Sequence, residues 1–128
     1  MAKGNQAFRV DNNLHPLIVW PAMSKSSRHS AYNFIQAARA RGHEIVGIFL
    51  YTDGVNNANR FINPPGERNI GALYDQLGAE GIPIVACTAC AKFRGMKRDL
   101  AVDHVKLSGL GSLAELVREA DRMVSFGD

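Results

Sequence analysis

The feature that most constrains the fold is a nearly unbroken apolar run at residues 45–51, Ile-Val-Gly-Ile-Phe-Leu-Tyr. A run of this length without polar alternation is typical of a strand that is covered on both faces, as strands are in a parallel sheet. Parallel neighbours need long crossover connections, which are usually helices. The run therefore predicts an α/β protein in which strands and helices alternate along the chain.

Shorter apolar runs and helical periodicities supply the rest of that alternation. We expect further strands at residues 17–20, 82–86, 104–107 and 122–126. Between strands, apolar residues recur at i, i+3, i+4 and i+7, the spacing of one buried helix face, in residues 31–38, 70–77 and 110–117. A shorter helix after Cys87 ends at Gly95, a typical stop residue. Residues 22–27 and 52–59 are predicted loops.

This order of elements predicts one three-layer domain at residues 15–128, preceded by a polar, flexible arm at residues 1–14. Five strands alternating with four helices indicate a five-stranded parallel sheet with right-handed crossovers, in the flavodoxin-like order 2-1-3-4-5. Ligands then bind outside the carboxyl ends of strands 1 and 3, where the chain reverses direction. Strand 3 ends at Cys87, opposite the loop at residues 21–27, and the loop of Asp53 leaves strand 2 at the same edge.

Cys87 and Cys90, the two cysteines of the chain, stand where a strand gives way to a helix. A thiol there faces the positive end of the helix dipole and unpaired N–H groups, which favour the thiolate. The Cys-x-x-Cys spacing also fits a redox dithiol, and both residues could simply pack as small apolar side chains. A structural zinc site needs about four ligands, and a second cysteine pair is missing. We expect no metal and no cofactor.

The chemistry open to a Cys87 thiolate is attack on a disulfide, on an electrophilic carbonyl, or on the outer sulfur of a persulfide. No obvious general base lies beside it in the sequence. Sulfur transfer between thiols needs little acid–base assistance, because attack by a thiolate and departure of a thiolate are both easy. Asp53 and Asn57 could orient a partner at the site, although an Asp-Gly pair more often only makes a turn.

Composition narrows the function classes further. The chain has 128 residues and no run of about 20 apolar residues, so no membrane span is expected. The polar N-terminus lacks the apolar segment of a secretory signal, and two cysteines are too few for a disulfide scaffold, so a reducing cytoplasm fits best. The net charge is +3 with scattered basic residues, which favours an acidic protein partner over nucleic acid.

Three motifs resemble the DsrE/TusD family of sulfur-relay proteins, also described as DsrE/DsrF-like. Residues 49–59 resemble the family's F-Y-x-x-G-V-x-N-A-N loop. The stretch from Cys87 to Gly95 resembles its C-x-A-A-x-x-R-G pattern, and residues 107–126 resemble its S-G-L-G-x-L-A-E…D-R-V-V-x-F pattern. The resemblance runs from about residue 17 to the end of the chain.

The resemblance implies a doubly wound sheet and a sulfurtransferase subunit in which Cys87 carries sulfur as a persulfide. Its partners would be small sulfur-carrier proteins, as donor and acceptor, and related DsrE-like subunits or further copies of the chain. We expect Arg94 to favour the anionic persulfide, and Cys90, where the family pattern has alanine, to be dispensable. The alternatives are a non-catalytic assembly subunit and a dithiol oxidoreductase that uses both cysteines.

An apolar loop at residues 55–65 is the expected contact between subunits. It includes Phe61 and Ile62, which are costly to leave in water. We therefore expect the chain to form an oligomer through this loop.

Overall fold

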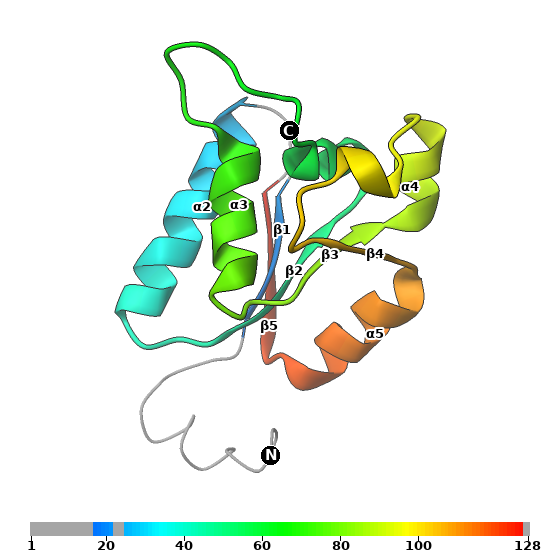
Figure 1. Cartoon of the computed structure of the whole chain (residues 1–128). Helices are drawn as coiled ribbons and strands as arrows, with labels where there is room; N and C mark the ends of the chain where they lie inside the picture. Colours follow the sequence, from blue (N-terminus) through cyan, green and yellow to red (C-terminus); the bar gives the residue numbers. More distant parts are fainter. Residues whose placement is uncertain (1–16, 22–24, 127–128) are drawn as a thin grey trace.

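The computed structural model of the protein describes residues 17–21 and 25–126, which form a sheet with helices on both sides (Figure 1). The strands are β1 (Leu17–Pro21), β2 (Ile45–Leu50), β3 (Ile84–Cys87), β4 (Lys106–Ser108) and β5 (Arg122–Phe126). The helices are α2 (Lys25–Ala40), α3 (Ile70–Ala79), α4 (Thr88–Phe93) and α5 (Leu110–Glu119). Two 3₁₀ helices complete the set, η2 (Thr52–Ala58) and η3 (Arg98–Leu100). The predicted arm at residues 1–14 lies outside the described residues.

The sheet has five strands in the order β4-β3-β2-β1-β5, and each neighbouring pair is parallel. The predicted α/β class with a parallel sheet is confirmed, but the predicted order 2-1-3-4-5 is wrong. That order places strand 2 at an edge, whereas all six residues of β2 are buried and β2 is the central strand. An unbroken apolar strand is most stable where both of its edges are paired and both of its faces are covered. The strands at the edges, β4 and β5, instead carry exposed residues.

Helices cover both faces of this sheet. Figure 1 shows α2 and α3 together on one face and α5 on the other, where α5 packs against β2 and β3. The largest fully buried side chains include Tyr74 of α3 and Phe49 of β2, together with Ile35 of α2. The predicted three-layer arrangement is therefore observed.

Two predicted loops contain helical structure. Residues 22–24 lie outside the described residues, but residues 25–27, also predicted as loop, form the first turn of α2. Residues 52–58 form η2, although the Asp53-Gly54 pair predicted a loop without helical structure. Its Val55 and Ala58 are fully buried, so burial of apolar side chains stabilises a compact turn there. Gly95, the predicted stop after α4, has φ +67° as expected.

The connections between strands change direction at the carboxyl ends of β3 and β4. From β1 to β4 each strand pairs with the strand that precedes it in the sequence. The chain then crosses the other face of the sheet through α5 and returns to β5, which pairs with β1. The connections that leave β3 and β4 therefore diverge, and open α/β sheets bind ligands outside the carboxyl ends of the strands at such a position. Cys87, the last residue of β3, pairs in register with Ser108, the last residue of β4. The expected crevice between strands 1 and 3, opposite residues 21–27, does not form because β2 separates them.

No helix in residues 25–126 is both long enough and apolar enough to cross a membrane.

Candidate functional site

Cys87 occupies the junction between β3 and α4. It is the last strand residue and also the N-cap of α4, with extended backbone angles of φ −65° and ψ 122°. The cysteine is a free thiol and only 4% exposed. The fold therefore places a buried thiol at the divergence point of the sheet.

Cys90 lies one helical turn further on and is 9% exposed. Its Sγ accepts a hydrogen bond from the backbone N–H of Thr52, with a donor–acceptor distance of 3.2 Å. Burial, followed by a side-chain hydrogen bond with Cys87, raises the pKa of the Cys90 thiol, while the Thr52 N–H and the charge of Arg94 act in the opposite direction. Cys90 therefore favours the protonated form, and Cys87 is one of the groups that raise its pKa.

Thr52 is the site residue that sequence reasoning missed. It begins η2, two residues after the end of β2, and has φ +50°, in the left-handed region that β-branched residues rarely adopt. Such a conformation costs of order 1–3 kcal/mol and persists only where surrounding contacts determine it. Here it accompanies the hydrogen bond to Cys90, which joins the turn after β2 to the thiol pair. The sequence gives no sign of this contact, because a threonine at positive φ has no composition signal.

The other predicted site residues lie at the same edge of the sheet. Asp53 and Asn57 belong to η2, which packs against both β3 and α4. Asn57 is fully buried within this packing, so its side chain is part of the core rather than a surface contact for a partner. Arg94 ends α4, and its guanidinium donates to the carbonyl oxygen of Cys90 at 3.1 Å. The guanidinium therefore binds the helical turn that carries Cys90.

The expected subunit contact at residues 55–65 is partly corrected. Val55 and Ala58 are fully buried within the same chain and cannot meet a partner. Phe61 is 70% exposed. Next to it, Arg60 donates to Asp103 at 2.9 Å, and this hydrogen bond lowers the pKa of the Asp103 carboxyl. Only the outer part of the loop, around Phe61, presents an apolar surface.

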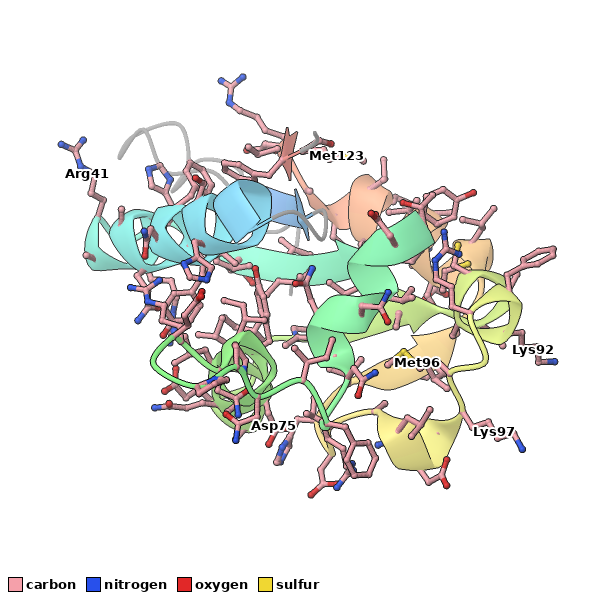
Figure 2. All side chains as sticks on the ribbon, turned by 90° about the horizontal axis from the view of Figure 1, so that it is seen from above. Arg41, Asp75, Lys92, Met96, Lys97 and Met123 are labelled. Carbon is pink, nitrogen blue, oxygen red and sulfur yellow. The ribbon has the colours of Figure 1, made fainter. Side chains whose placement is uncertain are left out.

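The outer side of α4 is apolar and basic. Phe93 is 90% exposed, and it lines a shallow hollow together with Ala89 and Lys92. In Figure 2 the side chains of Lys92 and Lys97 extend outward on the same side of the molecule, whereas Met96 lies further inward and is buried. A rise of 1.5 Å per residue places Phe93 about 9 Å along the helix from Cys87. We refer to Ala89, Lys92, Phe93 and Lys97 as the α4 surface.

The fold is shared with solved structures. The structure of the YchN protein from E. coli matches with a TM-score of 0.78 and 22% identity over 88% of this chain and all of that one. The structure of MTH1491 from Methanobacterium thermoautotrophicum, a protein of unknown function, matches with a TM-score of 0.65 and 19% identity, over 85% of this chain and 96% of that one. At these identities the likeness concerns the fold alone.

Comparison of sequences identifies the family of the chain, which the structural likeness alone does not. The chain is 40% identical over 112 residues to the DsrE protein of Allochromatium vinosum, covering 77% of this chain and 86% of that protein. It is 37% identical over 123 residues to the sulfurtransferase TusD of Yersinia pestis, covering 86% of this chain and 94% of that protein. The model of the DsrE/DsrF-like family matches residues 18–126. The chain therefore belongs to the DsrE/DsrF-like family.

Proposed function

We propose that the chain is a sulfurtransferase subunit of an intracellular sulfur relay, in which Cys87 accepts sulfane sulfur as a persulfide and passes it to a thiol of a carrier protein. The observation that carries the proposal is the position of Cys87, a free thiol at the carboxyl end of β3 where the connections of the sheet diverge. The similarity to TusD, which is named a sulfurtransferase, supports the same class of reaction.

The proposed reaction is two successive thiol exchanges. The Cys87 thiolate attacks the terminal sulfur of a donor persulfide, the donor's S–S bond breaks, and the donor thiolate leaves. A carrier thiolate then attacks the outer sulfur of the Cys87 persulfide, and Cys87 leaves as the thiolate. Both steps conserve sulfur and electrons, and neither needs a general base once the attacking thiol is ionised.

Burial of Cys87 adds a conformational requirement to this scheme. Cys87 is only 4% exposed, so a protein donor cannot reach its thiol without a local rearrangement. The elements over the thiol pair are short, since η2 has seven residues and α4 has six. Segments of this size open locally at a lower free-energy cost than global unfolding. Sulfur loading therefore follows local opening of η2 or α4.

The test of the proposal is mass spectrometry of the purified chain after incubation with inorganic polysulfide. We expect a gain of one sulfur atom, which peptide mapping assigns to Cys87. The absence of any adduct would favour the non-catalytic assembly subunit. Loss of two hydrogens as the first product, with no sulfur-bearing intermediate, would favour the dithiol oxidoreductase.

The α4 surface is the part of the site suited to receive the carrier protein. It combines an exposed aromatic ring with two outward lysines, and its residues lie on and just after the helix that begins at Cys87. Aromatic side chains are enriched at interface hot spots, and basic residues steer acidic partners. We assign as its occupant a carrier segment that has an apolar residue and acidic residues near its reactive cysteine.

Replacing Phe93 by alanine is expected to slow sulfur transfer to such a carrier by about tenfold, which corresponds to about 1.4 kcal/mol of lost binding. The probe is a synthetic peptide with one cysteine, one leucine and flanking aspartates, and transfer is measured from the preloaded chain by mass spectrometry. Loading by polysulfide should not change, because Phe93 lies outside the thiol pair.

The matched control is Phe61→Ala, which removes a second strongly exposed phenylalanine of the described residues, in the loop that follows η2 and outside the α4 surface. It should leave transfer unchanged. A peptide with lysines in place of the aspartates should receive sulfur more slowly from the unmodified chain. Equal effects of the two phenylalanine substitutions, or no preference for the acidic peptide, would exclude the α4 surface as the docking site.

A further inference from the structure

The proposed persulfide on Cys87 would have a second thiol, that of Cys90, one helical turn away. Cys87 and Cys90 are both free and both buried, and Cys90 follows Cys87 by three residues, in the first turn of α4. The Thr52 N–H donates a hydrogen bond to the Cys90 Sγ at 3.2 Å. The start of α4 therefore holds the two thiols one helical turn apart, without any rearrangement of the fold.

We propose that Cys90 is a resolving thiol, which attacks a Cys87 persulfide that meets no acceptor and releases its outer sulfur as hydrosulfide. This inference rests on the proposed function, because it requires sulfur on Cys87. It gives the chain a second activity, the discharge of unused sulfane sulfur.

The step balances without an added oxidant. Cys90 loses its proton, and its thiolate attacks the Cys87 Sγ, which is the inner sulfur of the persulfide. A Cys87–Cys90 disulfide forms, the bond to the outer sulfur breaks, and the outer sulfur leaves as hydrosulfide with the proton. The outer sulfur is reduced and the two cysteine sulfurs are oxidised. A low-molecular-weight thiol such as glutathione then reduces the disulfide and resets the pair.

The geometry of the pair fits this product. Side chains three residues apart at the start of a helix have Cβ atoms about 5–6 Å apart, and a disulfide needs about 3.5–4.5 Å, so a small closure suffices. Disulfide pairs of the Cys-x-x-Cys type occur at such helix starts.

The environment of Cys90 makes the discharge slow rather than immediate. Burial and Cys87 raise the pKa of the Cys90 thiol, against the opposing influence of Arg94 and the Thr52 N–H. The protonated thiol is a poor nucleophile, so an ionised carrier thiol that reaches Cys87 reacts first. Since the thiolate fraction of Cys90 grows with pH below its pKa, discharge should accelerate as the pH rises through that range.

The experiment follows a polysulfide-loaded chain, freed of excess donor and kept without any acceptor. The unmodified chain should release one sulfide per persulfide and lose two hydrogens relative to the unloaded form. Cys90→Ala should load normally and then release sulfide at least about tenfold more slowly, because the intramolecular attacker is absent.

A second variant separates chemistry from structure. Cys90→Ser retains an acceptor for the Thr52 N–H but not a nucleophilic sulfur, so it should hold its persulfide as Cys90→Ala does. Release at the unmodified rate in either variant, or sulfur recovered on Cys90 instead of as sulfide, would overturn the resolving role while leaving Cys87 as the carrier. Failure of the Cys90 variants to load on Cys87 would instead refute the proposed function and, with it, this inference. As a separate check on geometry, the thiol oxidant diamide should convert the unloaded unmodified chain to the internal disulfide.

Discussion

Replacement of Cys87 by serine is expected to reduce sulfur loading from polysulfide to background. A serine hydroxyl is not ionised near neutral pH, and it provides no thiolate to attack the donor sulfur. The substitution preserves the size and the buried position of the side chain, so the fold should be retained. Loading is measured by intact mass and by peptide mapping, and folding by the urea unfolding midpoint.

The matched control is the same substitution at the neighbouring thiol, Cys90→Ser. It should keep most of the loading and most of the transfer to an acidic cysteine peptide, because the carrier thiol is still present. If the Cys90 variant failed to load sulfur and the Cys87 variant loaded normally, Cys90 would be the sulfur carrier instead of Cys87. Equal loss of loading in both variants would make the dithiol oxidoreductase the better account.

The alternation of strands and helices could be predicted from the sequence because it depends on local apolar patterns. The run at residues 45–51 indicated a strand covered on both faces, and β2 is indeed fully buried. The strand order could not be predicted in this way, since pairing partners are set by which crossover packs on which face. The position of β5 beside β1 depends on α5 crossing back over β2 and β3, which no local signal in residues 110–119 encodes.

In the site, too, the features set by neighbouring residues could be predicted, whereas the contacts between distant residues could not. The placement of Cys87 and Cys90 where a strand gives way to a helix was predicted from local patterns, and α4 does begin directly after Cys87. The hydrogen bond between Thr52 and Cys90 joins residues 38 positions apart and depends on an unusual backbone angle, so it could not be predicted. Arg94 lies near the site as expected, but its guanidinium contacts a carbonyl of α4, a detail that only side-chain geometry reveals.

Replacement of Gly78 by alanine is expected to destabilise the fold by about 2 kcal/mol, although glycine-to-alanine changes inside helices usually stabilise by about 0.5–1 kcal/mol. Gly78 lies in α3, and a Cβ there would be 2.5 Å from the His104 Cβ and 2.8 Å from the His104 carbonyl oxygen. His104 cannot retreat easily, because its backbone N–H and its ring nitrogen both bind the Asp75 carboxylate, at 2.8 and 3.0 Å. Overpacking should therefore outweigh helix propensity.

The measurement is the urea unfolding midpoint, compared with that of Gly111→Ala. Gly111 also lies in a helix, α5, but an added Cβ would have no neighbour within 4 Å, so that variant should be neutral or more stable by up to about 1 kcal/mol. Opposite signs for the two substitutions would show that α3 packs directly on the segment that leads into β4. Since β4 ends at Ser108, which pairs in register with Cys87, the same contact sets the position of the strand beside this thiol. Equal stabilisation of both variants would mean that this segment shifts freely, and that its contact with α3 does not fix β4 beside Cys87.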